Sequence, residues 1–265
     1  MFALQISGGF MPRRKNIIIT GANGGFARPL MKRFAQPENR IYATCREENR
    51  QELIDNIEED DLKSTGVDIQ MNFADMRDEP SLHTAANAMS VYKFDVLINN
   101  AGILATDDDP DMSAEIRSQQ RKDLMQVNYF GPMYFTDCLL PKARNGATII
   151  NICSDANLYG RGHLESYSAS KGAVYSSTLS LAKRYENALN IYPVLPGWTR
   201  TKMGGLDKVQ AMRPEYVADR LYDIATGNTD APEGTKVFGI GPVYEREKHP
   251  GFYNFPYPKD EPVYD

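Results

Sequence analysis

The sequence predicts a doubly wound α/β fold, in which a parallel sheet of seven strands carries helices on both faces within a single domain. Short apolar runs alternate with longer amphipathic stretches along the chain. This alternation indicates repeated strand–helix–strand units. Most of the short runs are rich in Ile, Val and Leu, which is typical of strands buried on both faces.

Seven short runs are expected to form the strands. The first, NIIIT, ends at a glycine cluster, and RIYAT and VDIQMNF follow it. The later runs read FDVLI, ATIINI, NIYPVL and KVFGI. The expected strands are residues 16–20, 40–44, 67–73, 94–98, 147–152, 190–195 and 236–240.

Helix-like segments lie between these runs. The last of them starts at Pro214, an early helical position where the missing N–H of proline is tolerated. The expected helices are residues 26–34, 48–59, 80–91, 113–140, 166–189 and 214–225. Sheets of this kind bind ligands beyond the carboxyl ends of their strands, so we expect functional side chains in the loops that follow strands.

Composition narrows the function classes. The chain has 265 residues and a formal net charge of −5, so it has no bulk attraction for nucleic acid or anionic lipid. Three cysteines in a chain of this length do not suggest a disulfide framework, and a reducing, cytoplasmic location is expected. No apolar stretch is long enough to predict a membrane span.

The two ends differ from the body of the chain. We expect an N-terminal tail at residues 1–14, a catalytic and dinucleotide-binding domain at 15–247, and a C-terminal tail at 248–265. The C-terminal tail interleaves prolines with aromatic residues. Prolines forbid a regular helix there, and disorder is one interpretation. The aromatic residues, which disordered segments usually lack, favour docking on the same subunit or a neighbour.

A glycine cluster follows the first expected strand, at residues 20–27 (TGANGGFA). Glycines let the backbone turn tightly and approach a pyrophosphate, and the following helix offers its free N–H groups. An ordinary strand–helix turn also favours glycine. The position after the first strand of an alternating chain favours a Rossmann-type dinucleotide site.

The residues at the end of the second expected strand indicate which cofactor, NAD or NADP, the site favours. A site that selects NAD usually has Asp or Glu here for the ribose 2′-hydroxyl, whereas this chain has Cys45 followed by Arg46. A guanidinium can pair with a 2′-phosphate, so NADP is favoured over NAD. The alternative is a surface arginine paired with Glu47 or Glu48.

Three further positions suggest proton-transfer chemistry. Tyr167 and Lys171 are four apart and share a helix face; an ammonium near the phenol is expected to lower its pKa, although such pairs are commonly solvated. Ser154, after the fifth strand, suits a bond to a substrate oxygen or, alternatively, a turn cap. An amide side chain inside a helix is locally unfavourable, so Asn128 is expected either to have another role or to face water.

In this order along the chain, the motifs resemble those of the short-chain dehydrogenase/reductase family, in its compact single-domain branch. The resemblance runs from about residue 15 to about residue 241. It implies a catalytic tetrad of Asn128, Ser154, Tyr167 and Lys171. Tyr167 would transfer the proton, Lys171 would lower its pKa, and Ser154 would hold the substrate oxygen. Asn128 would hold a water that links Lys171 to solvent.

The resemblance also implies a cofactor site. It assigns an acidic contact to the adenine after the third strand, an Asn-Asn-Ala-Gly motif at 99–102, and a segment at 196–201 (PGWTRT) that packs on the nicotinamide. The implied cofactor-binding residues are Gly21, Asn23, Gly25, Phe26, Arg46, Asp75, Met76, Asn99, Ala101, Gly102, Tyr167, Lys171, Pro196, Gly197, Thr199 and Thr201.

The expected function is therefore an NADP-dependent oxidoreductase of the carbonyl reductase type, acting on a small carbonyl or alcohol. An NAD-dependent alcohol or hydroxysteroid dehydrogenase is one alternative, and a non-catalytic dinucleotide sensor or scaffold is another. No nucleic acid, membrane or metal partner is expected. The acidic run at 107–111 could suggest calcium, but a solvated loop is favoured. The family implies a homodimer or homotetramer formed through residues 113–140 and 166–189.

Overall fold

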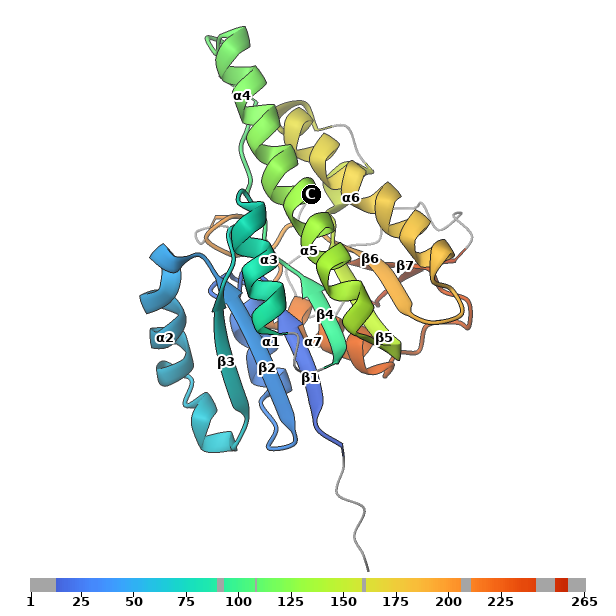
Figure 1. Ribbon diagram of the computed structural model, residues 1–265. Helices are drawn as coiled ribbons and strands as arrows, with labels where there is room; N and C mark the ends of the chain where they lie inside the picture. Colours follow the sequence, from blue (N-terminus) through green and yellow to red (C-terminus); the bar gives the residue numbers. More distant parts are fainter. Residues whose placement is uncertain are drawn as a thin grey trace, which may run out of the picture.

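The computed structural model describes residues 13–89, 93–107, 109–158, 161–205, 211–241 and 251–256. In these residues one parallel sheet of eight strands runs in the order β3-β2-β1-β4-β5-β6-β7-β8 (Figure 1). The strands are β1 (Lys15–Ile19), β2 (Asn39–Cys45), β3 (Asp68–Phe73), β4 (Phe94–Asn99), β5 (Ala143–Ile152), β6 (Asn190–Pro196), β7 (Val237–Ile240) and β8 (Phe252–Asn254).

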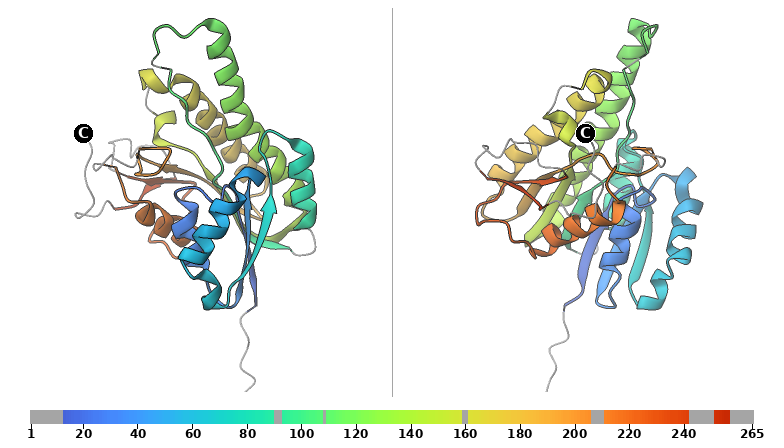
Figure 2. Two further views of the ribbon diagram at one scale, coloured as in Figure 1. Left: turned by 90° about the vertical axis from the view of Figure 1, so that its left-hand side faces the viewer. Right: turned by 180° about the vertical axis from the view of Figure 1, so that it is seen from behind.

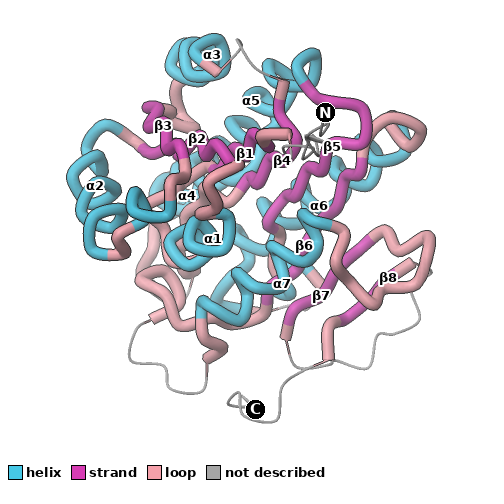
Figure 3. The backbone as a smooth tube through the Cα atoms, turned by 90° about the horizontal axis from the view of Figure 1, so that it is seen from below, coloured by secondary structure: helices cyan, strands magenta, loops and turns pink. Residues whose placement is uncertain are grey.

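Helices cover both faces of this sheet, as predicted. The helices α1, α2 and α7 share one core with the sheet, and α3, α5 and α6 share the other. Figure 3 shows α1 and α7 on the opposite side of the sheet from α3 and α5. The helices are α1 (Ala27–Phe34), α2 (Arg50–Glu59), α3 (Glu79–Ala88), α4 (Ala114–Met125), α5 (Gly131–Leu139), α6 (Glu165–Arg184) and α7 (Pro214–Thr226).

Alternation along the strands explains why they are apolar at successive positions. Successive side chains of a strand point to opposite faces. In β1, Ile17 and Ile19 enter the core beneath α1 and α7, whereas Ile18 enters the core beneath α3 and α5. Because both faces are covered by helices, a polar residue in either register would be buried.

The sheet has one strand more than the seven that the sequence predicts. The additional strand, β8, lies within the expected C-terminal tail and pairs in parallel with β7. Phe255, just beyond it, is buried and stacks on Phe238 with ring centroids 5.9 Å apart. A three-residue strand between prolines carries no alternation signal. Residues 1–12, 248–250 and 257–265 of the expected tails lie outside the described residues, as do residues 242–247 at the end of the expected domain.

The expected long helix at 113–140 is divided. A π-helical turn, Gln126–Phe130, separates α4 from α5, and α4 extends beyond the sheet beside α6 (Figure 2). Single π-turns inside helices are frequent at functional sites, and Asn128 lies in this one.

Two general properties complete the fold. Cys45, Cys138 and Cys153 are free thiols. In the part of the chain that is described, no helix combines the length and the hydropathy that a bilayer crossing requires.

Candidate active site

A cleft of about 1080 Å³ opens at the carboxyl ends of the strands. Its walls come from the glycine loop after β1 and from the loops that follow β2, β3, β4, β5 and β6. The strand order reverses between β1 and β4, which is where a doubly wound sheet leaves a ligand crevice. The topology therefore places the predicted motifs around one cavity.

The glycine loop is shaped by close backbone approaches. Gly21 has a φ of +62°, and a Cβ on it would lie 2.9 Å from the Cα of Ala101. The Asn100 amide donates to the carbonyl oxygens of Thr20 (2.9 Å) and Gly21 (3.1 Å), which fixes the loop against the end of β4. The N-cap residue of α1, Phe26, provides no side-chain cap, and the Gly24 carbonyl oxygen accepts from Ala27 N (3.1 Å) and Arg28 N (3.3 Å).

At the β2 end of the cleft, Arg46 pairs with Glu48 at 2.6 Å. This is the surface pairing that the sequence left as an alternative, although the Arg46 side chain still borders the cleft. Burial raises the pKa of the neighbouring Cys45 thiol to about 11, so it stays neutral. Asp75 lines the cleft next to Arg77, with the carboxylate and guanidinium 3.6 Å apart.

Of the cofactor residues predicted from the sequence, all of which lie in described segments, Asn99 alone does not line the cleft. Its amide group donates to Thr136 (2.8 Å) and to Asn151 (2.7 Å), inside the sheet and beneath α5. The structure gives Asn99 a sheet-stabilising position. The next residue, Asn100, faces the cleft instead.

At the other end of the cleft, Ser154 and Tyr167 lie together. The Ser154 hydroxyl accepts from the backbone N–H of Ala156 at 3.2 Å, so it is also the turn cap that the sequence allowed. Burial raises the pKa of Tyr167 to about 12, and a hydrogen bond with Ser154 offsets only part of that rise. The expectation that Lys171 lowers this pKa below its ordinary value is contradicted.

The position of Lys171 gives the physical reason. Its ammonium donates to the carbonyl oxygen of Ile152 at 2.8 Å and lies 5.9 Å from the centroid of the Tyr167 ring. Burial also lowers the pKa of Lys171 to about 8. An ammonium held against a carbonyl oxygen at this distance does not offset the desolvation of the phenol.

The Asn128 side chain is fully engaged behind the cleft. Its Oδ1 accepts from Ile103 N (2.8 Å), and its Nδ2 donates to Ile103 O (3.0 Å) and to Ser170 Oγ (2.9 Å). It does not line the cavity of the described chain. Asn128 therefore joins the loop after β4 to α6, two elements that carry cleft residues.

The segment after β6 closes one side of the cleft. Thr201 packs against Gly25, where a Cβ would approach the Thr201 methyl group within 2.4 Å. The indole of Trp198 donates to Gly204 O at 2.8 Å. Pro196, Gly197, Thr199 and Thr201 line the cleft together with Phe26, Asn23, Met76, Ala101 and Gly102.

The sequence did not identify two ion pairs of the cleft. Glu52 on α2 accepts from Asn23 (2.7 Å) and pairs with Lys202. Asp155 pairs with Arg161 at 2.9 Å, and burial raises the pKa of Asp155. Asp155 follows a strand end, so topology could have identified it. Glu52 gives no such signal, because its partner lies 150 residues away.

Metal-binding potential can be assessed for the described segments. There, no three His, Cys, Asp or Glu side chains gather in a way that could hold a metal ion. The arrangement in the cleft is instead a tyrosine, a serine and a lysine at one end of a groove that begins at a glycine-rich helix N-terminus.

This chain is similar to a known protein family and to several known proteins. A family model for short chain dehydrogenases matches residues 15–210. An uncharacterised oxidoreductase of Thermotoga maritima is 29% identical over 213 residues, which cover 78% of this chain and 80% of that protein. An NADP-dependent 3-hydroxy acid dehydrogenase of Escherichia coli (strain K12) is 28% identical over 230 residues, covering 79% and 88%.

A solved structure agrees in fold. A short chain dehydrogenase from Burkholderia cenocepacia, in complex with NADP, matches with a TM-score of 0.71 at 19% identity, covering 80% of this chain and 90% of that one. At this identity the likeness shows the fold alone.

Proposed function

Because the chain belongs to the short-chain dehydrogenase family, and is thus an NAD(P)-dependent oxidoreductase of small molecules, we propose that it is an NADPH-dependent carbonyl reductase with Tyr167 as its acid. The placement of Tyr167 beside Ser154 at one end of the cleft carries this proposal. A phenol with a pKa of about 12 holds its proton at neutral pH and can give it to a carbonyl oxygen. A phenol that remains protonated is a poor base for removing a proton from an alcohol.

The residues of the cleft fit a nicotinamide dinucleotide phosphate. The glycine loop that leads into α1, with the Gly25 backbone, suits the pyrophosphate, and Arg46 suits the 2′-phosphate. Asp75 and Met76 border the adenine end, and Thr199 and Thr201 the nicotinamide end. The cavity of about 1080 Å³ is large enough to hold a cofactor and a small substrate.

In the proposed reaction, Ser154 holds the substrate oxygen and Tyr167 gives it a proton. The bound nicotinamide supplies the hydride that reduces the carbonyl carbon. Lys171, whose pKa is about 8, is mostly protonated at pH 7 and holds the nicotinamide ribose. Asn128 has both polar ends of its side chain engaged, so we assign the relay water to its main-chain carbonyl.

Association and compartment are part of the same proposal. We propose a homodimer or homotetramer through α4, α5 and α6, where Ile116 and Phe130 are exposed. The relative from Escherichia coli is described as NADP-dependent, which supports NADP over NAD. Three free thiols suit the reducing cytoplasm.

The first experiment is a titration with NADPH and NADH, read by nicotinamide fluorescence and thermal shift. Tight NADPH and weak NADH would support the cofactor assignment and justify a panel of carbonyl compounds. Tight NADH would favour the alcohol or hydroxysteroid dehydrogenase. Binding of neither would favour the non-catalytic scaffold.

Tyr167→Phe tests the assigned acid. The variant keeps the buried ring and loses only the hydroxyl, so turnover should fall at least 10³-fold while the NADPH dissociation constant changes little. Tyr175→Phe, on the same helix, is the matched control and should retain activity. A Tyr167→Phe enzyme with normal turnover would refute the role of Tyr167.

A further inference from the structure

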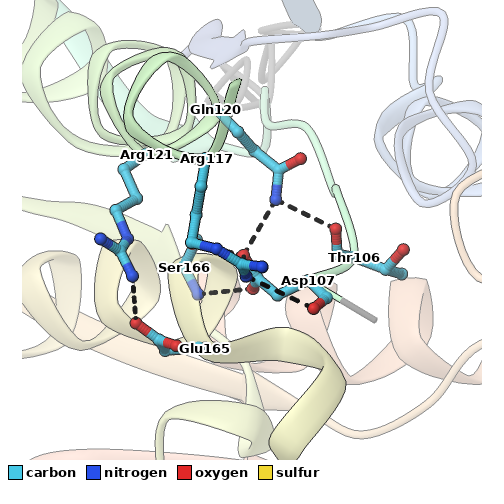
Figure 4. Close-up of polar contacts among 7 residues, drawn as sticks. All are labelled: Thr106, Asp107, Arg117, Gln120, Arg121, Glu165 and Ser166. Atoms are coloured by element: carbon cyan, nitrogen blue, oxygen red, sulfur yellow. Dashed lines mark hydrogen bonds and ion pairs between the residues drawn. The ribbon is translucent and has the colours of Figure 1, made fainter. Parts of the chain in front are cut away.

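Asp107 is a buried carboxylate in a run that the sequence interprets as a solvated acidic loop. Its side chain is 1% exposed, and in the described chain it does not line the cleft. Figure 4 shows Asp107 between α4 and the start of α6. A buried carboxylate requires several donors to offset its lost hydration, and these donors indicate what it does.

The principal donors belong to the first turn of α6. The Ser166 backbone N–H donates to Asp107 Oδ2 at 2.8 Å, and the Ser166 hydroxyl donates to Oδ1 at 2.7 Å. The residue at the N-cap of α6, Leu164, provides no side-chain cap. Asp107 thus caps this helix from 59 residues away, and its charge also suits the positive end of the helix dipole.

The other contacts of Asp107 tie this cap to the walls of the cleft. Its backbone N–H donates to His163 O at 2.9 Å. Gln120 of α4 donates to both Asp107 Oδ1 and Thr106 O at 3.0 Å. Thr106 and His163 line the cleft, so Asp107 joins two cleft walls to the first turn of α6 through its carboxylate, its backbone N–H and its partner Gln120.

Ser166 directly precedes Tyr167, which has little freedom of its own once the first turn of α6 is fixed. We propose that Asp107 is a positioning residue: it holds the first turn of α6 so that the Tyr167 phenol stays beside Ser154. The inference rests on the proposed function, because it acts through the proposed acid. A misplacement of about 1 Å at a reacting group lowers turnover by about 10²-fold.

Asp107→Asn is the direct test, because the amide keeps the size of the carboxylate but cannot accept both bonds from Ser166. With NADPH and 4-nitrobenzaldehyde as the probe, kcat should fall at least tenfold. The NADPH dissociation constant should stay within twofold. Hydrogen exchange at residues 165–171 should accelerate, since the first amides of α6 lose their cap.

Two further variants separate positioning from a loss of folding. Ser166→Ala removes only the hydroxyl bond and should lower kcat severalfold; combined with Asp107→Asn it should add little, since both act through one contact. Asp109→Asn is the matched control. Its carboxylate accepts from the nearby Asp111 N–H at 2.9 Å, and its substitution should leave kcat and exchange unchanged.

The outcomes distinguish this inference from the proposed function. An unchanged kcat in Asp107→Asn and in Ser166→Ala would overturn it, as would an equal loss in Asp109→Asn. A wild-type protein that binds NADPH but reduces no carbonyl compound would refute the proposed function instead. Hydrogen exchange does not require activity, so it would still test the inference in that case. Unchanged exchange at residues 165–171 in Asp107→Asn would overturn the capping role of Asp107.

Discussion

At the residue scale, the burial of the Lys171 ammonium costs the folded state stability. The side chain is buried, and its pKa falls from 10.5 to about 8. A depression of this size corresponds to about 3 kcal/mol of unfavourable free energy at pH 7. The hydrogen bond to Ile152 O returns about 1 kcal/mol.

Lys171→Met should therefore raise the free energy of unfolding at pH 7 by about 2 kcal/mol while it removes activity. Between pH 8 and 10.5 the folded wild type has released this proton and the unfolded chain retains it, so wild-type stability rises with pH. The advantage of the variant should shrink across that window. Urea unfolding at pH 7 and pH 10 measures this, with the exposed Lys183→Met as control; a constant advantage would contradict it.

Arg46 pairs with Glu48, so the 2′-phosphate of the proposed cofactor would compete with a carboxylate for the guanidinium. Arg46→Glu should weaken NADPH at least tenfold, the value of a charge-assisted hydrogen bond, with little effect on NADH. Glu48→Gln should tighten NADPH severalfold, because the guanidinium is released from its partner at 2.6 Å. Fluorescence titration of both cofactors measures this. Arg50→Glu, four residues away, should leave the NADPH preference intact; equal losses for NADPH and NADH in Arg46→Glu would remove the basis for NADP.

The proximity of the proposed catalytic residues was predictable from their spacing in the sequence, because that spacing determines local geometry. Tyr167 and Lys171 are neighbours on one helix face whatever the rest of the chain does. The electrostatics were not predictable. Whether the phenol is more or less acidic than usual depends on how much water the fold removes from it, and burial by segments distant in sequence decides that.

At the scale of elements, the π-turn and the helix after it depend on one glycine. A Cβ on Gly131, the first residue of α5, would lie 2.3 Å from the Met76 carbonyl oxygen. The Gln126 amide also donates to that oxygen at 3.1 Å. The sequence predicts one continuous helix over 113–140. Its periodicity contains no sign of this contact with the loop after β3, so the break in the helix could not be predicted.

Gly131→Ala should lower the free energy of unfolding by about 1–3 kcal/mol through this overpacking. It should also weaken NADPH binding, because Met76 lines the cleft. Gly172→Ala is the contrasting change on α6, where the nearest atom to a Cβ is 4.0 Å away. That variant should gain up to about 1 kcal/mol from helix propensity. Denaturant unfolding of both variants is the measurement, and equal effects would refute the packing argument.

At the scale of the whole molecule, Phe255 of the expected C-terminal tail belongs to the core. Phe255 is 3% exposed and packs between Phe238, Tyr253 and the guanidinium of Arg220. The Tyr216 hydroxyl donates to Pro256 O at 2.8 Å, which ties this segment to α7. The composition indicated docking, but a register with β7 comes only from the tertiary fold.

Phe255→Ala should lower the free energy of unfolding by about 3 kcal/mol or more, as other buried phenylalanines do. Glu58→Ala, at an exposed position of α2, should change it by no more than about 0.5 kcal/mol. Thermal and urea unfolding provide the comparison. A Phe255→Ala protein as stable as the wild type would mean that residues 251–256 do not pack as described.

The shortness of β8 has a consequence for self-association. An edge strand of three residues offers another molecule few unpaired N–H and C=O groups, whereas a longer apolar edge is a template for aggregation. β7 is such a strand, buried at all four positions of its VFGI run. By pairing with β7, the short strand β8 covers an apolar edge that could otherwise pair with another molecule. Substitutions that detach β8 should therefore cause aggregation as well as loss of stability.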